Sequence, residues 1–471
     1  MGGRACVIGA GPNGLAAAIV LAQAAWQVDV LEAQSTPGGA VRTLELTLPG
    51  FRHDFGSAVY PLAAGAPFFS SLPLLSHGLE WIHSPAPVAH PLDDGSVAVL
   101  QRDLGETGKS LEIDGEAWVG LMRPFVENWS EFAPEALRPV PFIPKHPWLM
   151  ARFGMLALQP AQRVARRFRS ERTRALFAGL AAHSFLSLDE PLSAAFGMLM
   201  AISAHAVGWP IPRGGAQSLT NALCGYLSTF GSNVTTSYPV HNLQELAKYG
   251  LLLCDLSPRQ MIDIGKHRLS ESYKRQLTNY RYGPGVFKVD YALNAPIPWK
   301  ASSCLRAATV HLGGSFEEIA ASEEAMRKGK HADRPFVLLV QPSLFDKTRA
   351  PAGKHTAWAY CHVPHGSTVN MLERLENQIE RFAPGFRDCV LARRVFSTAD
   401  LESMDANLIG GSIAGGVMDI RQLLFRPTWR HYATSARDIY ICSASTPPGG
   451  GVHGMCGYHA AKMALARLSR S

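Results

Sequence analysis

Three glycines near the N-terminus have the spacing that binds the phosphates of a dinucleotide. Gly9, Gly11 and Gly14 follow a short apolar run of strand type, residues 4–8, and precede an Ala- and Leu-rich stretch that favours a helix. The first glycine permits a tight turn, the second lets the backbone approach a pyrophosphate, and the third lets the helix pack on the sheet. The N–H groups at the start of such a helix attract phosphate oxygens. The segment therefore predicts a Rossmann-type nucleotide site.

A carboxylate follows at a suitable distance. Glu32 lies 23 residues after Gly9 and directly after a second apolar run at 28–31. It can accept hydrogen bonds from a ribose and would repel a 2′-phosphate, which favours FAD or NAD over NADP. Such a glycine turn also occurs as plain structure, but the flanking strands, the helix and the acid together favour nucleotide binding.

Two further glycine-rich segments favour FAD over NAD. Gly38 and Gly39 permit close backbone approach, and Arg42 can neutralise phosphate charge; the alternative is an ordinary turn. Near the C-terminus, residues 443–454 form a glycine-rich loop before a predicted helix at 458–468. The positive end of that helix would stabilise a reduced, anionic flavin. Here too, the alternative is an unrelated glycine-rich turn.

The two ends of the chain together resemble the phytoene dehydrogenase and amine oxidase superfamily of FAD flavoproteins. The resemblance is carried by residues 38–51 (Gly-Gly-Ala, Thr, Pro-Gly-Phe) and 445–454 (Ser-Thr-Pro-Pro-Gly-Gly-Gly-Val-His-Gly), and it extends over 4–62 and 400–465. It is strongest for the branch that contains pyridine nucleotide-disulfide oxidoreductase domain-containing protein 2 and the bacterial phytoene-dehydrogenase-like proteins. The resemblance implies that these residues line the FAD: Gly9, Gly11, Gly14, Glu32, Gly38, Gly39, Arg42, Ser57, Val240, Gly451 and Val452.

Some features depart from that superfamily or leave alternatives open. Ala40 replaces the arginine that follows the glycine pair in many amine oxidases and carotenoid desaturases, which weakens any transfer of their substrates. Val240 is equally well interpreted as a core valine. The eight cysteines lie far apart without a C-x-x-C pair, so neither a redox dithiol nor a zinc site is predicted. The histidines also lack metal-binding spacing, and no metal is expected.

Two residues are candidates for a catalytic role. Lys288 lies on a predicted strand, 287–293, and resembles the lysine that holds a water beside flavin N5 in the amine oxidase group. Its charge would favour electron transfer; the alternative is a surface ion pair with Asp290, which shares its strand face. His453 is a candidate proton donor or substrate contact, and alternatively bonds only the local backbone.

The expected fold class is α/β, with a Rossmann-type FAD-binding domain interleaved with a mixed-sheet plus helical substrate domain. A composition of 47% hydrophobic and 18% charged residues excludes disordered, coiled-coil and collagen classes. Helical patterns over 115–210 and alternating strands over 285–362 are expected to form the second domain. The predicted boundaries place 1–95, 210–262 and 405–471 in the FAD-binding domain, and 96–209 and 263–404 in the substrate-binding or cap domain.

The positive charge of the chain is local. Residues 145–174 carry eight Lys or Arg and one Glu, which equals the net charge of +7. No nucleic-acid partner is therefore expected. Apolar and aromatic residues at 140–158 precede Arg163, Arg166, Arg167 and Arg169, an arrangement typical of peripheral membrane contact. The alternative is a solvated helix face over core, in a segment that only caps the substrate pocket. We expect a cytoplasmic protein, free or attached at a membrane surface.

The favoured hypothesis is an FAD-dependent oxidoreductase that transfers a hydride between flavin N5 and a carbon of an apolar, isoprenoid or lipid-like substrate. The reaction would be desaturation or alkene reduction, with oxygen or a quinone as electron acceptor. The alternatives are a carotenoid ketolase or isomerase, an amine oxidase, or a non-catalytic flavin-bound interaction protein. The substrate and the oligomeric state are left open.

Overall fold

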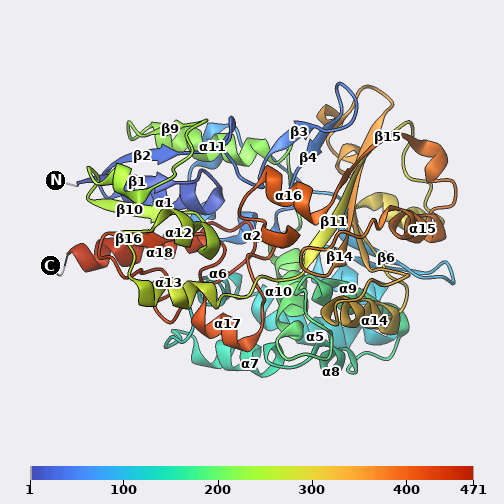
Figure 1. Cartoon of the computed structure of the whole chain (residues 1–471). Coiled ribbons are helices and arrows are strands. Elements are labelled where there is room, and N and C mark those ends of the chain that lie inside the picture. Colours follow the sequence, from blue (N-terminus) through green and yellow to red (C-terminus); the bar gives the residue numbers. More distant parts are fainter. Residues whose placement is uncertain (1–2, 470–471) are drawn as a thin grey trace.

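The computed structural model describes residues 3–469, which form two sheets with flanking helices (Figure 1). The first is a parallel five-stranded sheet in the order β16-β10-β1-β2-β9. Its strands are β1 (Arg4–Ile8), β2 (Gln27–Leu31), β9 (Asn233–Thr235), β10 (Leu251–Cys254) and β16 (Ile439–Ile441). Parallel neighbours from distant parts of the chain are the arrangement of an open Rossmann sheet. Both termini lie at this end of the molecule.

Helices cover both faces of the five-stranded sheet. One face packs against α1 (Pro12–Gln23), α11 (Gln217–Ser228) and α18 (Met455–Leu468) in a single apolar cluster. The other face packs against α12 (Pro258–Ile264) and α13 (Glu271–Thr278). Since both faces are covered, β1, β10 and β16 are apolar almost throughout, whereas β2 and the edge strand β9 alternate polar and apolar residues.

The second sheet has seven strands in the order β15-β11-β14-β13-β12-β6-β7. It is mixed, because β6 and β12 pair in parallel and the other neighbours are antiparallel. Its strands are β6 (Ala86–Pro91), β7 (Val97–Leu100), β11 (Gly285–Leu293), β12 (Ala307–Leu312), β13 (Val337–Val340), β14 (His355–Val363) and β15 (Val390–Phe396). Two further two-stranded antiparallel sheets pair β3 (Thr43–Glu45) with β4 (Arg52–Asp54), and β5 (Trp81–Ile82) with the distant β8 (Ile211–Pro212).

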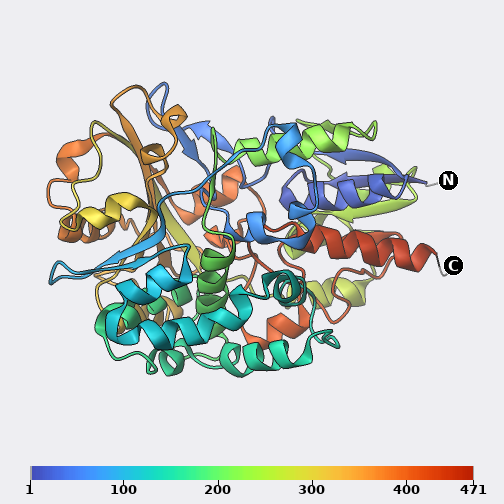
Figure 2. The same ribbon diagram turned by 180° about the vertical axis from the view of Figure 1, so that it is seen from behind.

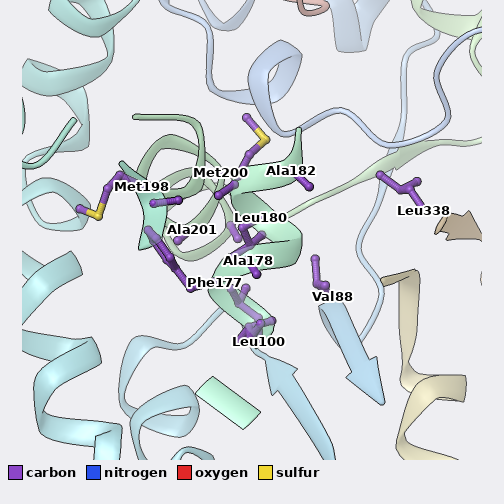
Figure 3. Close-up of a cluster of buried hydrophobic side chains, with 14 of the residues drawn as sticks. Val88, Leu100, Phe177, Ala178, Leu180, Ala182, Met198, Met200, Ala201 and Leu338 are labelled. Carbon is purple, nitrogen blue, oxygen red and sulfur yellow. The ribbon is translucent and has the colours of Figure 1, made fainter. Parts of the chain in front are cut away.

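A helical layer lies against one face of the seven-stranded sheet, at the bottom of Figure 2. It contains α4 (Leu104–Ser110), α5 (Gly115–Val126), α6 (Trp129–Ala136), α7 (Pro147–Ala157), α8 (Ala161–Ala165), α9 (Glu171–Ala182), α10 (Ser193–Ala206) and α14 (Phe316–Arg327). Figure 3 shows Phe177 and Leu180 of α9 with Met198 of α10, next to Val88 and Leu100 of the sheet. The other face packs on α15 (Leu372–Phe382). The remaining helices are α2 (Pro61–Gly65), α3 (Pro67–Ser70), α16 (Thr398–Met404) and α17 (Ile420–Phe425).

The α/β class and the interleaved two-domain arrangement are confirmed, but two predicted boundaries are displaced. β6 lies in the seven-stranded sheet although residues 1–95 were assigned to the FAD-binding domain. It pairs with β12, more than 200 residues later, and no local pattern specifies that partner. Likewise α13 packs on the five-stranded sheet although it follows the predicted boundary at 262.

Within residues 3–469, no helix combines the length and the apolar character needed to cross a membrane.

Candidate functional site

A cavity of about 580 Å³ extends from the glycine turn after β1 to the second domain. Its first half is lined by the ends of the Rossmann strands and their following loops. Its second half is lined by β13, β14, α10 and the segment after α9. One continuous space therefore joins the predicted nucleotide site to the predicted substrate domain. Of the sequence-predicted residues, the cavity is lined by Gly9, Gly11, Glu32, Gly39, Ser57, Val240, Gly451 and Val452.

The turn between β1 and α1 is built by close backbone approach. Gly9 has φ +96°, a conformation that side chains disfavour, and its N–H donates to the carbonyl of Leu31 on β2. A Cβ on Gly14 would lie 2.1 Å from the carbonyl oxygen of Gly9. Gly14 therefore does not line the cavity; it lets α1 start directly against the turn.

Glu32 lies at the end of β2 with both carboxylate oxygens engaged. One accepts a hydrogen bond from the Ala10 N–H at 2.7 Å and the other from the Gln34 N–H at 2.8 Å. Each oxygen keeps a lone pair for a further donor. The carboxylate is thus fixed at the cavity wall where a ribose hydroxyl could bind.

Asp255, which the sequence analysis did not single out, faces the same turn. It follows β10, and its Oδ2 accepts a hydrogen bond from the Gly14 N–H at 2.9 Å. Burial is the main cause that raises the pKa of its carboxyl to about 8, and the charges of Asp405 and Glu32 add to it. Near pH 7 the carboxyl is therefore largely protonated, which limits negative charge beside a site for phosphates. An acid that follows a buried strand is the signal that could have pointed to it.

The second glycine pair contributes one residue to the wall and one to the loop. Gly39 lines the cavity, whereas Gly38 turns away from it. Arg42 is buried; its Nε donates to the Gly39 carbonyl at 2.6 Å and its Nη2 to the Met404 carbonyl at 2.8 Å. The guanidinium therefore fixes the glycine loop to the C-terminal end of α16, and its contact with a phosphate stays a prediction.

The C-terminal glycine loop leads the chain from the cavity into α18. Gly451 and Val452 line the cavity, and α18 begins three residues after Val452, at Met455. His453 is buried and its Nδ1 accepts the N–H of Met455 at 3.0 Å, which satisfies one free amide at the start of the helix. Burial lowers its pKa to about 4, so the ring is neutral near pH 7. His453 does not line the cavity, and the geometry matches the local backbone role.

Ser57 and Val240 line the cavity from different segments. Ser57 Oγ donates to the Tyr60 hydroxyl at 2.9 Å, which fixes the side chain. Val240 is half-buried between β9 and β10, and within residues 3–469 its backbone makes no hydrogen bond. Its side chain also packs against the apolar cluster on one face of the five-stranded sheet, so both interpretations remain open and the adenine contact stays a prediction.

Lys288 forms an ion pair with Asp290, but this pair is buried rather than on the surface. The Lys288 side chain is 3% exposed, and its Nζ lies 5.4 Å from the ring centre of Trp358 and 5.2 Å from that of Phe396. Burial raises the pKa of Asp290 to about 6 despite the lysine. The surface-pair alternative is thus wrong, because the polar face of β11 packs inside the molecule. Lys288 does not line the cavity, although Trp358 does.

The second half of the cavity is largely apolar and aromatic. Phe196 and Met200 of α10 line it, together with Leu338 of β13 and Trp358 and Tyr360 of β14. Met200 and Leu338 also belong to the core cluster of Figure 3. Such a lining excludes water and suits an apolar molecule. Among residues 3–469 no group of three or more His, Cys, Asp and Glu is placed to hold a metal, and the cysteines are free.

Comparisons with known proteins agree with this arrangement. A family model described as an NAD(P)-binding Rossmann-like domain matches residues 7–69. Pyridine nucleotide-disulfide oxidoreductase domain-containing protein 2 of Rattus norvegicus is 25% identical, over 98% of this chain and 93% of its own length. Phytoene desaturase (lycopene-forming) of Pseudescherichia vulneris is 24% identical over 96% of both chains.

The solved structures show the fold. A variant of putrescine oxidase matches with a TM-score of 0.61 at 15% identity, with 100% of both chains covered. The similarity therefore extends beyond the nucleotide-binding segment to the second domain. The chain is thus similar in sequence to the phytoene desaturases and to pyridine nucleotide-disulfide oxidoreductase domain-containing protein 2, and it has the two-domain fold of the solved putrescine oxidase.

Proposed function

We propose that the chain binds FAD in the first half of the cavity and oxidises or reduces an apolar substrate in the second half. The observation that carries this proposal is the continuity of the cavity. It joins Glu32 and the β1 turn to the loop before α18, and then to the aromatic wall of β14. A dinucleotide placed with its ribose at Glu32 and its phosphates at the glycine turn would direct its second ring system toward the other domain.

The residues at the wall fit such a cofactor. Asn13 Oδ1, in the first turn of α1, is buried without a hydrogen-bond partner among the described residues. The Gly11 and Gly39 backbones approach each other there, since a Cβ on Gly39 would lie 3.5 Å from the Cα of Gly11. These glycines, the α1 N-terminus and Glu32 would hold the pyrophosphate and ribose, while Gly451 and Val452 would border the ring.

Bound FAD supplies two-electron redox chemistry through hydride transfer. The protein's own residues orient the two partners and keep water out. Trp358 and Leu338 form an apolar wall, and α18 directs the positive end of its dipole toward the cavity. Desaturation or alkene reduction of a carbon chain is the reaction we propose, with oxygen or a quinone as the electron partner.

The reaction is tested with the protein as isolated. Organic extraction and mass spectrometry would identify an apolar molecule that copurifies, and that molecule is then mixed anaerobically with fresh protein. We expect the flavin absorbance near 450 nm to change within seconds (~10 s⁻¹ is a typical turnover rate). The same test is made with a matched panel of hydrocarbons, and each compound is also tried as an oxidant of the reduced flavin. If none of these compounds reduces the bound flavin or reoxidises it, the result would instead support a non-catalytic flavin-bound protein.

We also propose that the protein attaches peripherally to anionic membranes through residues 140–174. Ile143 and Trp148 are 92% and 88% exposed, and Met155 and Leu158 are exposed as well. Arg163, Arg166, Arg167 and Arg169 are exposed beside them, and no ion pair involves them among the described residues. Apolar side chains next to unpaired cations favour an anionic lipid surface.

Sedimentation with anionic liposomes tests the attachment. Each of four cations contributes about 1 kcal/mol near such a surface, so replacing the four arginines by Gln should release most of the protein at low salt. Trp148→Ser should lower the part that persists at high salt. Wild-type protein that stays in the supernatant at low salt would contradict the attachment and leave this segment with its packing role in the helical core.

A further inference from the structure

Polar groups without partners occur at the far wall of the cavity, in the half that we assign to substrate. Tyr360 lines this wall, and its hydroxyl has no hydrogen-bond partner among residues 3–469. His183, directly after α9, lines it as well. Its Nε2 lies 3.2 Å from His311 Nε2, and its Nδ1 has no partner within the same residues. Buried or cavity-facing polar groups normally find partners, so these are the atoms to explain.

The register of the second sheet places these groups near one another. His311 of β12 is in register with Leu338 of β13, which is in register with Tyr360 of β14. The three residues thus form one row across the strands, and its ends, His311 and Tyr360, are two strand spacings of about 4.8 Å apart. His183 contacts the His311 end of this row, with ring centres 5.2 Å apart. The unpartnered His183 nitrogen and the Tyr360 hydroxyl therefore flank the same part of the cavity.

Two tryptophans add unpaired donors to this region. The indole N–H groups of Trp209 and Trp358 are both buried without a partner among the described residues, and both side chains line the cavity. Trp209 lies edge-to-face with His183 at 5.7 Å, and Trp358 is stacked on Tyr360 at 5.6 Å. Each polar group thus has an aromatic neighbour that fixes its orientation.

The side chains that line this wall are uncharged, and the charges on the neighbouring strand β11, Lys288 and Asp290, are paired with each other outside the lining. Burial lowers the pKa of His183 to about 3, so the ring is neutral near pH 7. The acidic residues of the lining are Glu32, Asp255, Asp263 and Asp405, all in segments of the nucleotide half. Neither an ammonium nor a carboxylate on the substrate would meet an opposite charge at the far wall, and transferring an unpaired charge there is costly.

We propose that the substrate is an uncharged, mainly apolar molecule with one oxygen-containing end group, a hydroxyl or a carbonyl, which His183 and Tyr360 bind. The apolar part lies along Phe196, Met200 and Leu338, and the end group fixes which carbon faces the nucleotide half. This inference rests on the proposed function only in taking the far half of the cavity as the substrate site. It identifies His183 and Tyr360 as specificity-determining residues.

Binding of three matched probes tests it: 1-octanol, octane and octylamine, which is protonated at pH 7. Binding is followed by the fluorescence of the tryptophans, since Trp209 and Trp358 line the site. Tyr360→Phe removes one oxygen and keeps the stacking on Trp358. We expect it to weaken octanol binding about fivefold, as one lost hydrogen bond does, and to leave octane unchanged. His183→Phe should act in the same direction.

Met200→Leu is the matched control, because Met200 lies on the same wall and has no hydrogen-bonding group. This substitution should change the affinities for octanol and for octane by the same factor. Octylamine should bind wild-type protein at least about tenfold more weakly than octanol. Octylamine bound as tightly as octanol, or a Tyr360→Phe effect as large on octane as on octanol, would overturn the inference. FAD content is measured on the same samples, so failure of cofactor binding is seen separately.

Discussion

Asp255 lies against the glycine turn, and its charge changes within an accessible pH range. Its folded-state pKa of about 8 is above the ordinary value, so the folded protein binds this proton more tightly than the unfolded chain does. The stabilisation that this carboxyl contributes is therefore fully present at low pH and is lost as the pH rises from about 4 toward 8. The same ionisation places a negative charge beside the predicted phosphates.

We expect Asp255→Asn to remove that part of the pH dependence. The amide oxygen can still accept the Gly14 N–H, and no charge forms. Urea unfolding at pH 6 and pH 8.5 should show that the wild type loses more stability than the variant. FAD affinity should also fall above about pH 8 in the wild type only. Parallel pH profiles for both proteins would contradict this assignment.

Lys288 tests whether the buried pair is structural or also acts on the cofactor. Lys288→Met leaves Asp290 buried and unpaired, which should lower the free energy of unfolding by about 3 kcal/mol. The double variant Lys288→Met/Asp290→Asn should recover most of that loss in thermal unfolding. If Lys288 acts beside flavin N5, oxygen should reoxidise the reduced flavin of this double variant more than about tenfold more slowly than that of the wild type. An unchanged rate would leave Lys288 with the structural role alone.

At the scale of elements, the contact between α1 and α18 depends on one glycine. A Cβ on Gly457 would lie 1.8 Å from the Asn13 carbonyl oxygen, which is backbone and cannot move aside easily. Gly457→Ala should therefore separate the two helices and lower the melting temperature, in spite of alanine's better helix propensity. Gly154→Ala in α7 is the control, because nothing lies within 4 Å of its added Cβ. It should gain up to about 1 kcal/mol. Equal effects would refute the packing argument.

The same scale shows what the sequence could predict. The β1–α1–β2 unit and α18 were predictable because their apolar patterns, glycines and terminal acid are all local. The place of β6 was not, since its parallel partner β12 is distant in sequence. The burial of Lys288 was missed for a related reason: alternation shows which residues share a face, but not whether water or another layer covers it. Asp255, His183 and Tyr360 belong to no motif, and only the fold brings them to one cavity.

At the scale of the molecule, a buried ion pair connects the two domains. Arg349 follows β13 and pairs with Asp54 of β4; both side chains are fully buried. Asp54 also accepts the N–H of Ala216, just before α11 of the first domain, at 2.8 Å. Arg349→Leu leaves this carboxylate unpaired and should lower the free energy of unfolding by about 3 to 5 kcal/mol.

Arg213→Leu is the matched comparison in denaturant unfolding. Its pair with Glu80 is half exposed and screened by water, so the loss should be much smaller than for Arg349→Leu. Similar losses for the two variants would mean that the buried pair does not hold the domains together.

The identity of the bound nucleotide tests the central claim most directly. The purified protein is denatured, and the supernatant is analysed by absorbance and chromatography against FAD, FMN, NAD and NADP standards. The continuous cavity from Glu32 to Val452 predicts noncovalent FAD near one equivalent, released in full. Protein that carries no flavin and still binds none after incubation with FAD, or that retains NAD or NADP in its place, would contradict the account.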